Sequence, residues 1–133
     1  MIRSFTISSL RALKLSSGQI SKRRMTMNIE DTVVRNSDVE IYFNFRVAYL
    51  LEDDRTAGRL EIDGRLDVSE SQSGAEGIKG EWRSNKRLPK KLEEEVTDYL
   101  FFECESRGVL ACYSVNLPPP VPMTSRLVLS SGL

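Results

Sequence analysis

The stretch VEIYFNFRVAYLL, Val39–Leu51, has a hydrophobic residue at every second position. The residues between these positions, among them Glu40, Asn44 and Arg46, are more polar. Successive side chains of a β-strand point to opposite faces, so the alternation predicts one long strand with a wholly apolar face. Its β-branched and aromatic residues suit a pleated, half-buried surface. Such a strand needs neighbouring strands and a hydrophobic layer across its face.

Three more segments alternate in the same way and predict the rest of the sheet. We expect strands at about residues 4–16, 25–34, 39–51 and 58–69. In the last of these, Leu60 and Ile62 alternate with Arg59 and Glu61, which indicates one buried and one solvated face, as in antiparallel sheets. The connection at residues 52–56 is short and charged, which favours a long hairpin. Gly64 falls on the apolar side and suggests a bulge or a close backbone approach.

The first two predicted strands are less regular. Phe5 and Ile7 alternate, but Leu10 and Ala12 fall out of phase with them, as a bulge near residues 8–9 would produce. Residues 1–24 contain no acidic residue and several basic residues and serines, which is also typical of an organellar transit peptide. A strand is the favoured interpretation, because transit peptides form amphipathic helices. In the second strand, the alternation predicts that one face carries Met25, Met27, Ile29 and Val33.

The second half of the chain predicts a helix after a poorly patterned region. Residues 70–87 are small, polar and rich in glycine, and we expect a loop in which Trp82 caps the core. A helix at about residues 89–107 should begin at Leu88-Pro89 and stop at Gly108. We interpret four of its residues, at helical spacing, as core or subunit interface: Leu92, Val96, Tyr99 and Leu100.

Apolar residues remain outside that helical stripe. Phe101 and Phe102 lie off it, so they indicate either a wide buried face or a binding surface. Residues 109–123 are apolar and end in a proline-rich run, which predicts a stiff apolar loop at the surface. The last ten residues could form a brief second helix.

Composition favours a protein that works by binding. The 133 residues contain 19 basic and 19 acidic side chains, so no overall charge favours nucleic acid or membrane. There is no histidine, which removes most zinc sites and the usual general base. Cys104 and Cys112 have no metal-site spacing and suggest buried thiols in a reducing compartment. We therefore expect no enzyme, no cofactor and no metal, and a cytoplasmic location.

The order of these parts resembles the SecB family of export chaperones. Ser106-Arg107-Gly108 and then Asn116-Leu117-Pro118 stand where that family has a small-residue helix stop and an apolar proline loop. The resemblance implies an α+β fold, with a four-stranded antiparallel sheet, a long C-terminal helix and a short second helix packed on one face. It also implies a tetramer built as a dimer of dimers and an ATP-independent holdase that binds unfolded polypeptides, in protein export and transport or in guarding an antitoxin.

The resemblance also suggests where clients bind. The predicted client-binding groove consists of Phe101, Phe102, Leu110, Tyr113, Val115, Leu117, Val121 and Met123. Docking of the SecA motor in that family uses acidic residues, and here only Glu61 has the expected sign, so docking is doubtful. Two other interpretations stay open: a small-molecule site or enzyme using Glu40, Arg46, Glu61 and Asp63, and an adaptor that binds one partner through the proline loop.

Overall fold

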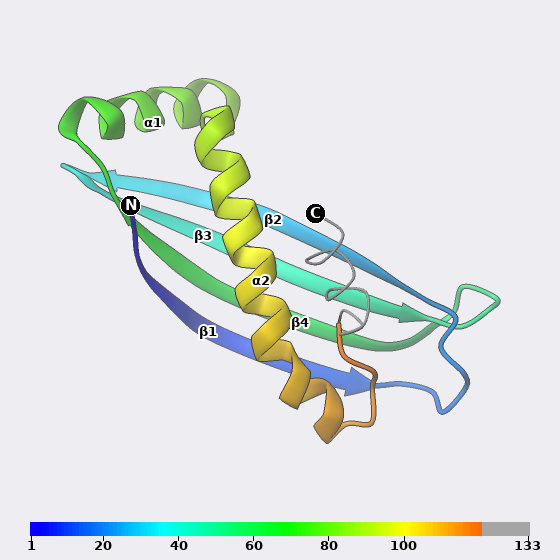
Figure 1. Cartoon of the computed structure of the whole chain (residues 1–133). Coiled ribbons are helices and arrows are strands. Elements are labelled where there is room, and N and C mark those ends of the chain that lie inside the picture. Colours follow the sequence, from blue (N-terminus) through cyan, green and yellow to red (C-terminus); the bar gives the residue numbers. More distant parts are fainter. Residues whose placement is uncertain (121–133) are drawn as a thin grey trace, which may run out of the picture.

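The computed structural model describes residues 1–120 and confirms the predicted α+β fold (Figure 1). Four strands form one antiparallel sheet in the order β1-β4-β3-β2. The strands are β1 (Ile2–Lys14), β2 (Lys22–Arg35), β3 (Asp38–Leu50) and β4 (Thr56–Ser69). Two helices follow, α1 (Gln72–Asn85) and α2 (Lys90–Ser114). The hairpins β2–β3 and β3–β4 place β3 between its sequence neighbours, and the pairing of β1 with the other edge of β4 makes β4 central as well.

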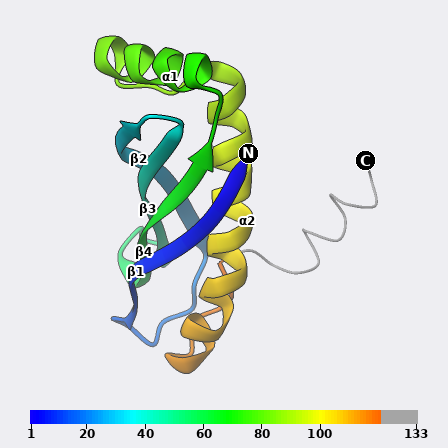
Figure 2. The same ribbon diagram turned by 90° about the vertical axis from the view of Figure 1, so that its left-hand side faces the viewer.

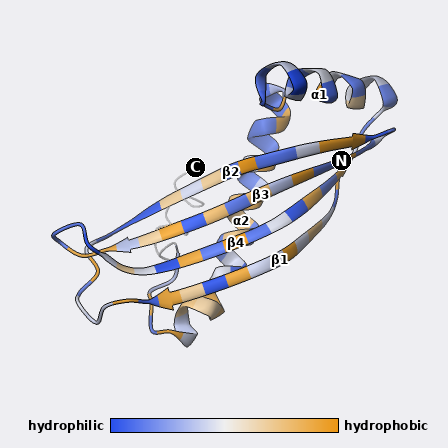
Figure 3. Ribbon diagram, turned by 180° about the vertical axis from the view of Figure 1, so that it is seen from behind, coloured by the Kyte–Doolittle hydropathy of each residue, from blue (hydrophilic) through white to orange (hydrophobic). Residues whose placement is uncertain are grey.

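The core lies between the sheet and α2, which crosses one face obliquely (Figures 1 and 2). The alternating residues of β3 from Val39 to Tyr49 are almost completely buried on this face. They pair with Leu60, Ile62, Gly64, Leu66 and Val68 of β4. The opposite face of the sheet has no described helix across it (Figure 3). The long alternating strand is therefore the centre of the fold, as its sequence predicts.

Register shifts in the two edge strands decide which of their residues face α2. The predicted bulge in β1 is present, because the register against β4 shifts between Ile7 and Ser9. It places Leu10 and Ala12 on the same face as Phe5. A second bulge in β2, between Ile29 and Asp31, was not predicted from the alternation.

The bulge in β2 overturns one prediction about that strand. Val33 pairs with Glu40 and lies on the polar face, so its expected place beside Ile29 is wrong. Val34 pairs with Val39 and takes the apolar position instead. One extra residue in a strand turns every later side chain to the opposite face of the sheet. The prediction assumed an unbroken alternation, so it assigned the residues after the bulge to the wrong face.

Gly64 marks a close approach, as expected. A Cβ atom built at Gly64 would lie 2.3 Å from the backbone oxygen of Thr6 and 2.8 Å from Cζ of Phe43. No side chain fits in that space. Glycine therefore allows β1 to pair closely beside β4 and the Phe43 ring to pack over this position.

The loop predicted for residues 70–87 is wrong, because most of it forms α1. Ser71 caps the helix through its Oγ, which accepts a hydrogen bond from the backbone N–H of Gly74 at 3.0 Å. Lys86 ends the helix in the left-handed conformation, with φ of 56°. Ala75, Ile78 and Trp82 pack against the core at helical spacing, and the glycines between them obscured this signal.

The predicted helix stop at Gly108 is also wrong, since α2 continues to Ser114 and includes residues 109–114 of the expected loop. A Cβ atom at Gly108 would lie 2.6 Å from Cδ2 of Leu60, so this glycine allows close packing of helix on sheet. The chain leaves the helix at Val115 and Asn116, where Asn116 has φ of 59°. The brief helix expected in the last ten residues lies outside the described residues, and the second helix observed is α1.

Candidate functional site

The side of α2 that faces the sheet is fully used by the core. Val96, Leu100, Cys104, Gly108 and Cys112 follow one another at intervals of four residues and are buried. Val96 and Leu100, predicted as core or subunit interface, therefore lie in the core of the described chain. Stable packing of the helix is thus explained without any residue on its other side.

The two other residues of that predicted stripe lie at its margin. Leu92 and Tyr99 are partly buried against the core. The Tyr99 ring meets the Phe5 ring edge to face, with centroids 6.2 Å apart. Tyr99 therefore anchors α2 on β1, and both residues belong to the margin of the core.

That outward side carries exposed apolar residues along the last three turns of α2, with the exposed Ser106 among them. Phe102, Leu110 and Tyr113 are 50%, 80% and 56% exposed. They are separated by eight and three residues, so they share one side of the helix, together with half-buried Val109. We call these four residues the outer apolar stripe. In Figures 1 and 2, no described helix or strand lies over the side of α2 that faces away from the sheet.

The first half of α2 differs on the same side. Lys91, Glu94, Glu95 and Asp98 are exposed there and charged. A helix that only covered a sheet would keep charged residues along its whole outer side. The change from charged to apolar residues at Phe102 therefore separates a solvated half from a half suited to contact with another molecule.

The structure divides the predicted client-binding groove into two sets. Phe102, Leu110 and Tyr113 stand together on the outer apolar stripe. Phe101 turns toward the sheet, where its ring meets Phe45 edge to face at 5.8 Å. Leu117 is only 2% exposed and belongs to the core. Consecutive residues of a helix point about 100° apart, so Phe101 and Phe102 must face different neighbours, but the sequence alone does not show which of the two faces the sheet.

The remaining predicted groove residues follow the helix. Val115 is partly buried against the core, and Val121 and Met123 lie outside the described residues. The Leu117 methyl groups fill the space above Gly58, where a Cβ atom would lie 2.5 Å from Cδ2 of Leu117. The segment after α2 is therefore anchored to the sheet.

Two hydrogen bonds hold that segment in place. The Arg23 guanidinium donates to the backbone oxygen of Pro119 at 2.7 Å. The backbone N–H of Leu117 donates to the Cys112 oxygen at 2.8 Å. Beside this anchored segment lies a hollow that was not predicted, lined by Ile20, Met25, Pro118 and Pro120 together with Ser21, Lys22 and Arg23.

The cysteines have the burial expected from the sequence and no reactive character. Burial raises the pKa of the Cys104 thiol to about 12. Burial also raises the pKa of Cys112, whose Sγ lies 3.3 Å from the Tyr49 hydroxyl. Both thiols therefore stay protonated and enclosed near neutral pH, which is unsuitable for a nucleophile.

The carboxylates of the sheet are held in ion pairs and hydrogen bonds. The Asn44 amide donates to Glu61 at 3.1 Å and to Asp63 at 2.7 Å. Arg11 and Arg46 both pair with Glu61. The Asn44 hydrogen bond, with help from Arg46, holds the pKa of Glu61 below its ordinary value. Glu61 is thus a fixed anion, and its neutralised charge does not create an acidic docking surface.

Two further observations limit the chemistry of the described part of the chain. Within residues 1–120, no group of three or more His, Cys, Asp or Glu side chains is placed to hold a metal ion. Neither α1 nor α2 has the length and hydrophobicity needed to cross a lipid bilayer.

Comparison with solved structures gives the fold a precedent. The structure is similar to the Mycobacterium tuberculosis Rv1957 SecB-like chaperone in complex with a ChAD peptide from the Rv1956 HigA1 antitoxin, with a TM-score of 0.63. The match covers 90% of this chain and 85% of that one. The chain has a SecB-like fold.

The likeness lies in the fold alone. Sequence identity over the match is 8%. No protein-family model matches the sequence, and no curated protein matches it. The order of strands and helices is therefore preserved where residue identity is not, and the function must be argued from the residues on α2.

Proposed function

We propose that this protein is an ATP-independent holdase, which binds non-native polypeptides on the outer apolar stripe of α2. The observation that carries the proposal is the exposure of Phe102, Leu110 and Tyr113 on a helix whose other side already fills the core. Unfolded chains expose apolar side chains, and burial of such surface is favourable and non-directional. A site of this kind accepts many sequences, and it needs neither nucleotide nor metal.

The size of the stripe sets its affinity. A client side chain buried fully against such a surface contributes about 1.5–3 kcal/mol before ordering costs. Three exposed side chains therefore give weak binding from one subunit. We propose a homo-oligomer, built as a dimer of dimers, because several linked weak sites hold a long client far better than one site does.

The physiological role that best fits is capture of a client before it folds or aggregates, in the cytoplasm. The neighbouring Rv1957 structure holds an antitoxin peptide, which supports an antitoxin as one class of client. Delivery to an export motor is less well supported, because Arg11 and Arg46 neutralise Glu61, the acidic residue expected to dock it. We therefore favour client protection over export.

The test compares two double variants, each of which replaces two exposed apolar residues, for their ability to suppress aggregation of a client protein. We expect Leu110→Ser with Tyr113→Ser to lose most of the protection that the wild-type chain gives to reduced insulin, measured by light scattering without nucleotide. The control is Leu13→Ser with Leu15→Ser, because these leucines are 48% and 53% exposed but lie on β1 and the segment after it.

Both variants should keep the wild-type circular dichroism, since all four residues are exposed. Equal protection by the two variants would remove the outer apolar stripe from the binding site. Absence of protection by the wild-type chain would reject the holdase proposal itself.

A further inference from the structure

The face of the sheet opposite α2 carries a concentrated group of arginines. Strand pairing places two neighbouring rows of side chains across all four strands at one end of this face. One row is Leu13, Arg59, Ala48 and Arg24, and the other is Arg11, Glu61, Arg46 and Thr26. We call Arg11, Arg24, Arg46 and Arg59 the arginine patch. Four cationic side chains thus surround one carboxylate.

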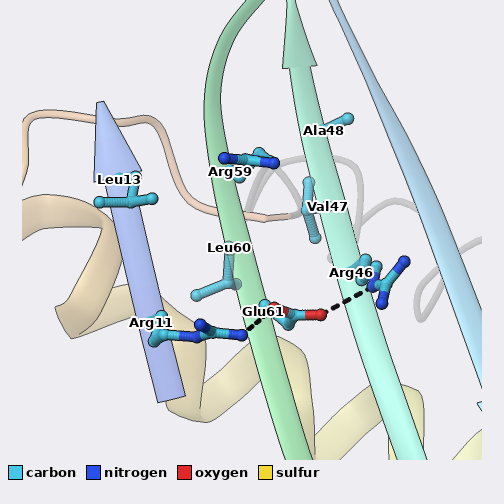
Figure 4. A pocket seen from close by; sticks show the side chains of 8 residues that line it. All are labelled: Arg11, Leu13, Arg46, Val47, Ala48, Arg59, Leu60 and Glu61. Carbon is cyan, nitrogen blue, oxygen red and sulfur yellow. Dashed lines mark hydrogen bonds and ion pairs between the residues drawn. The ribbon is translucent and has the colours of Figure 1, made fainter. Parts of the chain in front are cut away.

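Glu61 organises the patch without neutralising it. Its Oε2 accepts from Nε of Arg46 at 2.8 Å, and its Oε1 pairs with Arg11 (Figure 4). These ion pairs fix two guanidinium groups in place while leaving both more than half exposed. Within residues 1–120, Arg24 and Arg59 make no ion pair. Four arginines around a single glutamate therefore leave the patch with a net positive charge, and Arg24 and Arg59 carry it without an ion pair inside the described residues.

Three arginines of the patch line a hollow that also offers apolar contact. A hollow of about 380 Å³ is lined by Arg11, Arg46, Arg59 and Glu61 around Leu13 and Ala48 (Figure 4). Leu13 is 48% exposed. Such a site suits a ligand with carboxylates for the arginines and an apolar side chain for Leu13.

The rest of the same face limits what can bind. The next rows along the strands contain Asp63, Asp31, Asp67 and Glu40, with Arg65 among them. The arginine patch is therefore short, roughly 14 Å across the strands and 7 Å along them by the usual spacings of a sheet. A long polyanion would run onto the acidic rows. The patch rows also contain no aromatic ring for stacking nucleotide bases.

We propose that the arginine patch docks a short acidic segment of a partner protein. Two or three carboxylates of the segment would bind the guanidinium groups, and one apolar side chain would rest on Leu13 and Ala48. This site lies on the face of the sheet that α2 does not cover, whereas the outer apolar stripe lies on α2. A partner can therefore be held at the arginine patch without covering that stripe. The proposal does not depend on the holdase activity.

The experiment measures peptide binding by fluorescence anisotropy at low salt. The probe is a labelled twelve-residue peptide in which glutamates alternate with leucine and serine, and its matched control has lysine in place of every glutamate. The wild-type chain should bind the acidic peptide at least about ten-fold more tightly than the lysine peptide. Raising the salt to about 0.5 M should weaken binding, because these charges are exposed.

Two variants with the same change in charge locate the site. Arg24→Gln with Arg59→Gln should weaken binding of the acidic peptide about ten-fold or more. Arg83→Gln with Lys91→Gln, on the two helices, should leave it within about two-fold. All four side chains are exposed, and both proteins should keep the wild-type circular dichroism and insulin protection.

Four results would overturn the proposal. The first is equal affinity for the acidic and lysine peptides, and the second is equal loss of affinity for the acidic peptide in the two variants. The third is tighter binding of a twelve-nucleotide single-stranded DNA than of the acidic peptide. The fourth is self-association of the wild-type chain that is lost in Arg24→Gln with Arg59→Gln. The last two would assign the patch to nucleic acid or to a second copy of the chain. Insulin protection is scored separately, so either proposal can fail alone.

Discussion

At the scale of single residues, neighbours in sequence have different tasks in this protein. Phe101 packs its ring on Phe45, whereas Phe102 is half exposed. Glu61 faces solvent in the strand alternation, yet it is held by Asn44 and two arginines. The type of each residue was readable from the sequence. Its partners were not, because they come from strands and helices distant in the chain.

Glu61 gives a prediction about pH. Its pKa is lowered in the folded protein, so its ion pairs stabilise the fold above the unfolded-state pKa and lose that effect as the pH falls through the folded-state value. Glu61→Gln should therefore unfold more easily than wild type at pH 7, and the difference should shrink toward about pH 3.

The measurement is urea unfolding followed by circular dichroism at several pH values. Glu95→Gln is the control, because Glu95 is an exposed carboxylate on α2. A stability difference for Glu61→Gln that does not change with pH would show that its effect comes from packing instead of charge.

At the scale of elements, the helical glycines have two kinds of surroundings. In α1, a Cβ atom added at Gly77 or Gly80 would meet nothing within 4 Å. In α2, Gly108 lies against Leu60, and the helix runs six residues beyond it. Sequence reasoning treated all of them as signs of a loop or a stop. Only the packing shows that Gly108 is a contact point inside a helix and that α1 is held by Ala75 and Ile78.

Alanine substitutions separate the two kinds of glycine. Gly77→Ala should stabilise the protein by roughly 0.5–1 kcal/mol, because alanine restricts the unfolded chain and fits the open helix surface. Gly108→Ala should destabilise it by roughly 1–3 kcal/mol, because its methyl group overpacks the interface with β4.

Thermal and urea unfolding of both variants measure the difference. Gly80→Ala repeats the first substitution at an independent position of α1, where the surroundings are equally open. Stabilisation by Gly108→Ala would mean that α2 can move away from β4 at little cost.

At the scale of the whole molecule, the sheet and α2 each have one buried side and one exposed side. One face of the sheet holds the core, and the other carries the arginine patch. The sheet side of α2 is buried, and its outward side carries the outer apolar stripe. The SecB-like fold therefore leaves two chemically different surfaces available on one chain of 133 residues.

The exposed stripe also leads to a prediction about assembly. A 15.1 kDa chain with this much apolar surface on one helix should associate in solution. Size-exclusion chromatography with light scattering at micromolar concentration should give a mass near that of four chains. Leu110→Ser with Tyr113→Ser, compared with Leu13→Ser and Leu15→Ser, tests whether the stripe takes part in assembly as well as in client binding. A monomeric wild-type chain would contradict the proposed dimer of dimers.

The sequence by itself determined the antiparallel sheet, its long central strand, the bulge in β1 and the helix that covers the core. These follow from local periodicity, because side-chain direction in a strand or helix repeats at a fixed interval. Tertiary structure alone decided that Leu117 is buried and Leu110 exposed, that Val34 replaces Val33, and that four arginines meet on one face. Each of these depends on register, bulges and packing between distant segments, which periodicity within one segment does not contain.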